Sequence, residues 1–254
     1  RRLGTQSDCH GRLVKILLAN DTAIIRHFGC QGVSDAHARM LGAAGHEVVH
    51  RVFVKALHHH RGRLDEQLVA SLSRDEALVS QIDSVDAVVV NGEGTIHHGK
   101  GRPLMALLAL AQSRSKPTFL VNAVFQESET FLDTLRRLDD FTVRDGCSLA
   151  YAESLGLRVR LVADSILAAR FADASPEFHG DVVTDGHTHR PEVIEALNAF
   201  QVARPATHLR FSAEDAFTSW ATLPARLREA AVMVTGRHHG VYIALMAGIP
   251  FVAL

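Results

Sequence analysis

A polar turn at Arg237, His238 and His239 combines the residue types needed to bind an anion and to transfer a proton. It follows an apolar stretch over residues 232–235 and precedes an Ala- and Leu-rich stretch typical of a helix. A guanidinium group binds carboxylate or phosphate through paired hydrogen bonds, and an imidazole titrates near neutral pH. Glycines on both sides favour this functional interpretation over an ordinary polar loop. We therefore expect Arg237 and His238 to bind substrate and His239 to act in catalysis.

A second polar stretch, residues 91–102, reads NGEGTIHHGKGR and follows the mainly apolar residues 86–90. Glycines expose backbone N–H groups and basic side chains add positive charge, which is typical of a loop that holds phosphate or carboxylate. The GxxxxGK[ST] spacing of a P-loop is missing, and a solvated glycine-rich turn is the alternative. Glu93 is a candidate general base. The substrate-binding residues expected here are Gly92, Gly94, Thr95 and Lys100.

Arg144 stands at the end of another short apolar stretch, residues 141–143. Because Asp145 or Ser148 is placed to cap the next helix, Arg144 is expected to point toward the ligand-binding edge of the sheet. There it would bind carboxylate or phosphate, and an ion pair between domains is the alternative.

Two carboxylates, Asp21 and Asp164, also follow apolar stretches. Asp21 lies in the sequence NDT, ahead of Arg26, which we include among the substrate-binding residues. Asp21 is interpreted either as a catalytic base or as a helix N-cap. For Asp164 a helix cap is the favoured interpretation. A dinucleotide site is disfavoured because the first strand-to-helix turn has no GxGxxG sequence.

Histidine is unusually frequent, with 16 in 254 residues, yet the sequence predicts no metal site. The run at residues 58–60 is the best candidate, but consecutive side chains point in different directions. No carboxylate or cysteine stands near it at a ligand spacing. We expect no metal and no redox cofactor.

Composition limits the class of protein and its partners. A formal net charge of -1 argues against a nucleic-acid partner, which requires a strongly basic surface. Three cysteines without CxxC spacing favour a reducing compartment, and no apolar run approaches the roughly 18 residues needed to span a bilayer. We expect a cytoplasmic protein, with peripheral contact at the inner membrane face if its substrate is lipid-linked.

Alternating apolar stretches and helical patterns predict a doubly wound parallel α/β fold. Strands are expected over residues 14–19, 47–54, 86–90, 118–122, 141–143, 158–163, 181–184, 207–211 and 232–235, and again after Pro250. Helices are expected over residues 32–45, 64–82, 101–113, 128–138, 149–155, 191–200 and 213–229, and after the turn at residues 237–239. We place one Rossmann-like domain at residues 1–165 and a second at 166–254. The second is expected to be truncated, since the sequence stops directly after a strand.

Taken in order, these motifs resemble the polysaccharide pyruvyl transferases. The similarity is carried by NDT, NGEGT, VRDGCS, the strand-end Asp164, GRHHG and GIPFVAL. It implies two Rossmann-like domains facing a cleft, as in B-type glycosyltransferases. It also implies transfer of the enolpyruvyl group of phosphoenolpyruvate to saccharide hydroxyls as a ketal, in cell-envelope or capsular polysaccharide biosynthesis. The acceptor would be a saccharide, free or lipid-linked.

Carried over by position, the family's Arg-x-His falls on Arg237 and His239, and the arginine of its Arg-Asp/Glu segment falls on Arg144. His239 is then the expected acid, and Asp21 or Glu93 the expected base. The sequence departs from the family at NDT, in place of Asn-x-Gly-Asp, and at His238, in place of an apolar residue. Two alternatives are a glycosyltransferase that uses a nucleotide-activated sugar and a non-catalytic sugar- or anion-binding protein.

Overall fold

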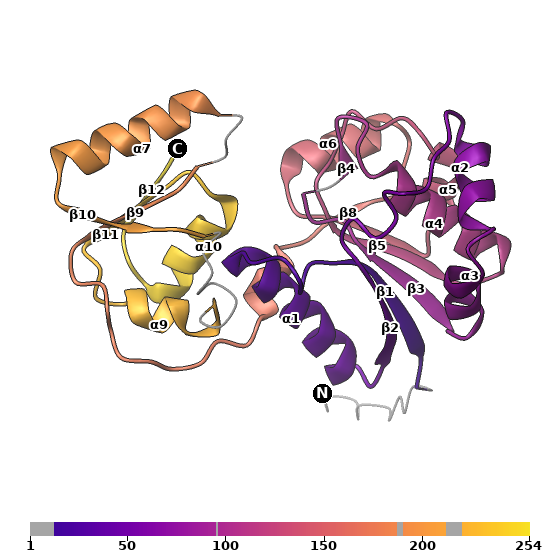
Figure 1. The fold of residues 1–254 in the computed structure, drawn as a ribbon, viewed down its shortest axis with the longest axis horizontal. Helices are drawn as coiled ribbons and strands as arrows, with labels where there is room; N and C mark the ends of the chain where they lie inside the picture. The colour runs from indigo at the N-terminus through magenta and orange to yellow at the C-terminus, as the bar shows by residue number, and fades with distance from the viewer. Residues whose placement is uncertain (1–12, 95, 187–189, 212–219) are drawn as a thin grey trace, which may run out of the picture. The chain divides into compact units, whose positions relative to one another are not determined.

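The computed structural model describes residues 13–94, 96–186, 190–211 and 220–254 (Figure 1). The chain divides into two compact units, each described by itself. Unit 1 contains the described residues up to Asn20 together with Met40–Val162. Unit 2 contains Asp21–Arg39 and Ala163–Leu254, so the chain enters unit 2 early, returns to unit 1 and then enters unit 2 again.

Unit 1 is built on a six-stranded sheet of order β2-β1-β3-β5-β7-β8. The registered pairs β1/β3, β3/β5, β5/β7 and β7/β8 are all parallel. The first strand lies inside the sheet, so the strand order runs outward from it in both directions, as in doubly wound folds. The strands are β1 (Lys15–Asp21), β2 (Glu47–Phe53), β3 (Ala87–Asn91), β5 (Thr118–Ala123), β7 (Asp140–Val143) and β8 (Arg160–Leu161).

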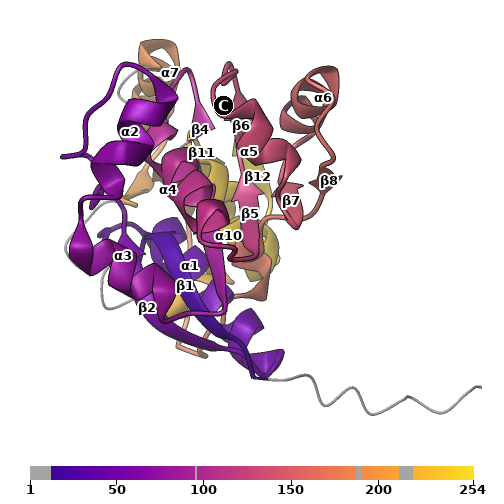
Figure 2. The ribbon, with the colours of Figure 1, turned by 90° about the vertical axis from the view of Figure 1, so that its right-hand side faces the viewer.

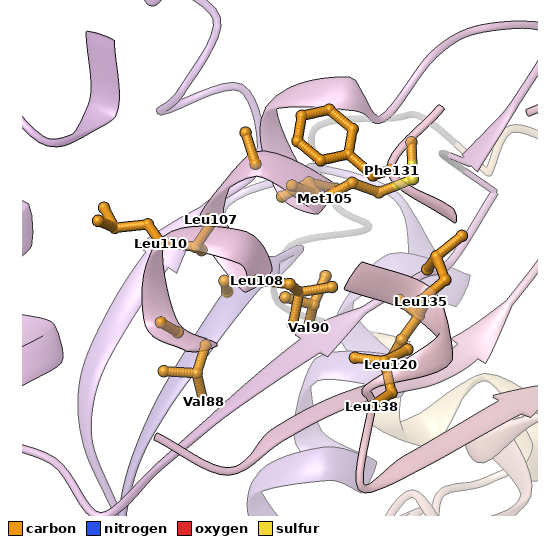
Figure 3. Close-up of a cluster of buried hydrophobic side chains, with 14 of the residues drawn as sticks. Val88, Val90, Met105, Leu107, Leu108, Leu110, Leu120, Phe131, Leu135 and Leu138 are labelled. Carbon is orange, nitrogen blue, oxygen red and sulfur yellow. The ribbon is translucent and has the colours of Figure 1, made fainter. Parts of the chain in front are cut away.

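Helices cover the sheet of unit 1 because alternate strand residues are apolar on both faces. On one face, Val88 and Val90 pack with Leu120 and with α4 and α5 (Figure 3). Helices α2, α4 and α5 lie side by side over this face (Figure 2). The helices are α1 (Phe28–Ala43, which passes from unit 2 into unit 1), α2 (Asp65–Leu72), α3 (Glu76–Asp83), α4 (Arg102–Ser113), α5 (Leu132–Arg136) and α6 (Gly146–Ser154).

Unit 2 is built on a parallel four-stranded sheet of order β10-β9-β11-β12. Val183 and Val234 pack against α7 on one face, and Val182 and Met233 contribute to the core with α9 and α10 on the other (Figure 1). The strands are β9 (Asp181–Thr184), β10 (Ala206–Leu209), β11 (Val232–Thr235) and β12 (Phe251–Ala253). The helices among the described residues of this unit are η1 (Ser165–Ala168), α7 (Pro191–Ala203), η2 (Trp220–Thr222), α9 (Leu223–Leu227) and α10 (His238–Ala247).

The predicted α/β class with parallel sheets is confirmed, and the differences from prediction are local. The helix expected over 64–82 is two helices, because Asp75 caps α3 by accepting a hydrogen bond from the Leu78 N–H group. The helix expected over 128–138 is confined to α5. Part of the helix expected over 213–229 lies outside the described residues. A two-stranded sheet of β4 (Ile96–His97) and β6 (Phe125–Gln126) is not predicted by the sequence.

Candidate functional site

In unit 2, the junction between β11 and α10 presents the histidines of the GRHHG sequence. Arg237 is the N-cap residue of α10, and its N–H group donates to the Thr235 hydroxyl, 3.1 Å away. Gly240 packs directly on the same residue, because a Cβ atom at this position would lie 2.1 Å from Thr235 Oγ1. The glycine therefore permits the tight turn that places His238 and His239 at the positive end of the helix.

The carboxylate of Asp164 lies beside both histidines. Its Oδ1 atom accepts from the Ile166 N–H group at 2.9 Å and so caps η1, which confirms the predicted cap. Its Oδ2 atom lies 3.0 Å from His238 Nε2 and 3.8 Å from His239 Nε2. The side chain of Asp164 is completely buried, that of His239 is 7% exposed and that of His238 is 43% exposed. A buried carboxylate thus holds one accessible and one buried imidazole.

Helix α1 contributes a third histidine, His37, which the sequence does not single out. Burial lowers the pKa of His37 to about 4, because desolvation outweighs the opposing charges of Asp164 and Asp21. His37 is therefore neutral at pH 7. Helix α1 also contributes Gly29, where a Cβ atom would lie 1.9 Å from His239 Nδ1, so the His239 ring packs against its backbone.

Asp21 is buried and accepts hydrogen bonds from neighbouring groups of unit 2. Its Oδ1 atom accepts from the Ser34 hydroxyl at 2.5 Å and from the Ala23 N–H group at 3.0 Å. The interpretation of Asp21 as a helix N-cap is wrong, since α1 begins only at Phe28. Its role as a base stays a prediction.

The two arginines expected to bind substrate in unit 2, Arg237 and Arg26, differ in burial. Arg237 Nη2 lies 2.5 Å from Asp185 Oδ2, and the arginine side chain is mostly buried. Asp185 follows β9, and its position directly after an apolar strand is a signal that sequence reasoning missed. Arg26 lies exposed in the turn before α1.

The carboxyl ends of β1 and β3 form a buried polar network in unit 1. Asn20 Nδ2 donates to the Asn91 carbonyl at 2.7 Å, and Asn91 Oδ1 accepts from the Glu93 N–H group at 3.1 Å. Glu93 is buried, with an Oε2 atom 3.4 Å from Asn91 Nδ2. Gly92 packs against β5, since a Cβ atom there would lie 2.5 Å from the Ala123 Cβ atom.

The other described residues expected in unit 1 lie on two loops. Gly94 and Lys100 line a pocket beside α4, whereas Thr95 lies outside the described residues. Arg144 follows β7, and its N–H group donates to the Ala123 carbonyl at 3.2 Å. Asp145 caps α6 as predicted, by accepting from the Ser148 N–H group at 2.8 Å.

Within the part of the chain that the structure describes, two groups of side chains have the composition of a metal site. Donor atoms of Asp164, His238 and His239 lie within 4.8 Å of one another, and so do those of His59, His60 and Asp75. The expectation that no carboxylate accompanies the histidine run is wrong, because the fold brings Asp75 Oδ2 to 3.5 Å from His60 Nε2.

Fold and site together define a doubly wound α/β protein with a buried carboxylate–imidazole cluster. The polysaccharide pyruvyl transferase family model matches residues 34–254, and the chain belongs to this family. It is thus a transferase, with pyruvyl transfer in polysaccharide biosynthesis as its broad activity. Among the described residues, no helix is long and apolar enough to cross a membrane.

The two solved structures described next are only distantly similar to this chain in sequence. No curated protein matches the sequence. UDP-GlcNAc 2-epimerase of Methanocaldococcus jannaschii, solved with UDP-GlcNAc and UDP, is 8% identical with a TM-score of 0.45, over 96% of this chain and 84% of that chain. A carbohydrate transporter of Acidothermus cellulolyticus 11B, solved with myo-inositol, is 10% identical with a TM-score of 0.34, over 95% of this chain and 74% of that chain.

Proposed function

We propose that the protein transfers the pyruvyl group of phosphoenolpyruvate to a saccharide and forms a cyclic ketal with two of its hydroxyl groups. Two C–O bonds form at the central carbon of the donor, and its C–O bond to phosphate breaks. One hydroxyl proton is balanced by protonation of the methylene carbon, which becomes a methyl group, and the other leaves with phosphate. This reaction requires an acid, a base and anion-binding groups, and no redox step. We propose that it uses neither a metal nor a cofactor.

The cluster of Asp164, His238 and His239 is the observation that supports this chemistry best. A carboxylate hydrogen-bonded to an imidazole fixes the ring and stabilises its protonated form. We assign the proton donor to His239, which the resemblance in sequence aligns with the family's Arg-x-His. His238 is the second candidate, because its ring is exposed and lies at hydrogen-bond distance from the same carboxylate.

The remaining roles follow from contacts within each unit. Asp21 Oδ1 already accepts two hydrogen bonds from unit 2, so we favour Glu93 as the base. Arg144 and Arg237 are the proposed partners of the donor's carboxylate and phosphate. The contact with Asp185 supports this role for Arg237, because it holds the guanidinium group in a fixed orientation.

The decisive experiment measures phosphate release from phosphoenolpyruvate with and without a panel of acceptor saccharides. Acceptor-dependent release, with a pyruvylated product identified by mass spectrometry, supports the proposal. Absence of such release counts against it, as does thermal stabilisation by nucleotide sugars but not by phosphoenolpyruvate.

Variants distinguish the two imidazoles. We expect His239→Gln to lower kcat about 10²–10⁴-fold, the usual contribution of a general acid. His238→Gln is expected to raise the KM for the donor with a smaller effect on kcat. The reverse pattern would assign the proton donor to His238.

A further inference from the structure

Unit 1 contains a pocket of about 510 Å³ whose lining includes none of the proposed catalytic residues. Neither Glu93 nor Arg144 lines it. Its volume lies within the range typical of small-molecule sites, about 300–1,000 Å³. We call it the basic pocket, after the side chains of Lys55, His58, His60, Arg61, Lys100 and Arg102 in its lining.

The basic pocket carries a net positive charge. No Asp or Glu of the residues that the structure describes lines it, and Asp65, which is outside the lining, has its Oδ1 atom 2.9 Å from Arg102 Nη2. Among the described residues, Lys55, Arg61 and Lys100 form no ion pair with a carboxylate. Burial lowers the pKa of His60, which disfavours its charged form.

Backbone groups add to the attraction for an anion. Helix α4 begins at Arg102 and places its N-terminus at the pocket, where the helix dipole favours negative charge. The N-cap residue, Gly101, has φ +83°, and Gly99 has φ +68°, conformations that suit glycine. Lys55 also has a positive φ of 68°, which is uncommon for a residue with a side chain and occurs preferentially at functional sites.

Apolar groups complete the pocket. Phe53, Leu57, Pro103 and Leu104 belong to the same lining. An apolar wall beside a cluster of cations suits a ligand with a carbon ring and an anionic group, as in a phosphorylated sugar.

We propose that the basic pocket binds the phosphate-bearing end of the acceptor saccharide. This assignment rests on the proposed function, because that function requires an acceptor in addition to the donor. Lys55, Arg61 and Lys100 bind the phosphate, and the apolar side chains of the lining contact the sugar ring. The volume is larger than a three-carbon donor needs, which favours the acceptor as the occupant.

Binding is tested on the whole protein by isothermal titration calorimetry with glucose 1-phosphate, glucuronate and glucose. We expect the tightest binding for glucose 1-phosphate. Lys55→Ala, Arg61→Ala and Lys100→Ala should each weaken it at least tenfold. Arg74→Ala, which removes an exposed arginine of unit 1 outside the pocket lining, should leave it unchanged. Equal binding of glucose 1-phosphate by all variants, or no binding by the wild type, overturns the proposal.

A competition experiment separates this proposal from the proposed function. Saturating phosphoenolpyruvate should leave the affinity for glucose 1-phosphate unchanged. Displacement by phosphoenolpyruvate would make the pocket a donor site and overturn the assignment, whereas phosphate release in the assay above would still support pyruvyl transfer. Preferred binding of glucuronate would overturn the phosphate assignment in favour of a carboxylated saccharide.

Discussion

Asp164 contacts both histidines of the α10 N-terminus, and its charge is the feature that we expect catalysis to depend on. Asp164→Asn keeps the shape of the side chain but places a neutral amide beside the imidazoles. We expect acceptor-dependent phosphate release to fall about 10²-fold or more, because the protonated imidazole loses its stabilising partner. The exposed Asp173, paired with Arg228, offers a control in Asp173→Asn, which should retain full activity. Equal activity of both variants would remove Asp164 from the mechanism.

His37 should make the stability of unit 2 depend on pH. Its pKa is lowered from 6.5 to about 4 in the folded protein, so the unfolded chain binds the proton more readily between these values. The contribution of neutral His37 to the free energy of unfolding is therefore fully present above pH 6.5. It is lost as the pH falls toward 4, by up to about 3 kcal/mol. Denaturant unfolding at pH 7 and pH 5 measures this loss.

The variant to compare with the wild type is His37→Gln, because a glutamine side chain does not bind a proton in this pH range. Its free energy of unfolding should change less between pH 7 and pH 5 than that of the wild type. His208→Gln, at an exposed position, should keep the wild-type dependence. A parallel pH dependence in wild type and His37→Gln would contradict the assignment.

The junction between β11 and α10 depends on the absence of a side chain at Gly240. Gly240→Ala would place a Cβ atom 2.1 Å from Thr235 Oγ1, and Thr235 is buried. We expect this variant to lose about 1–3 kcal/mol of stability, as overpacked cores do, and to displace the histidines. Thr235→Ala in the same chain should recover part of the loss, as a double-mutant cycle would show.

Gly42 in α1 is the matched control for Gly240. A Cβ atom at Gly42 has no neighbour within 4 Å, so Gly42→Ala should gain up to about 1 kcal/mol from helix propensity. Similar unfolding midpoints for Gly42→Ala and Gly240→Ala would show that the junction tolerates a side chain.

Helices and strands with strong local signals were predictable from the sequence. The strands β9 and β11 have the predicted bounds, because short apolar runs end at polar residues. Gly248 ends α10 in a left-handed conformation, as expected of a glycine before Ile-Pro. Burial along α1 was less predictable: Met40, near its end, is 40% exposed, because the spacing of apolar residues does not show which end of a helix is covered.

The contacts between distant segments were not predictable. His37 carries no sequence signal, since one histidine on a helix is ordinary, and its importance comes from burial beside Asp164 and Asp21. The sequence identified Asp164 only as a cap, because its contact with His238 joins residues far apart in the chain. The predicted cleft between the two domains stays a prediction.

Unit 2 is assembled from two separate stretches of chain, Asp21–Arg39 and Ala163–Leu254. The early stretch supplies Phe28, whose ring packs on Phe211 with centroids 5.6 Å apart, and Gly29 under the His239 ring. We therefore expect a fragment of residues 163–254 to lack a cooperative thermal transition by circular dichroism. Addition of a peptide of residues 21–39 should restore helical signal and a transition. Cooperative unfolding of the fragment alone would show that the early stretch is dispensable.

This interleaved connectivity has a consequence during protein synthesis. Residues 21–39 leave the ribosome long before residues 163–254 are synthesised. Their apolar side chains therefore stay exposed, without the residues they pack against, while the chain between these two stretches is translated. Slowed elongation or scarce chaperones would prolong that exposure. Aggregation of nascent chains should therefore be more sensitive to changes in residues 21–39 than to equally apolar changes within the late-made strands.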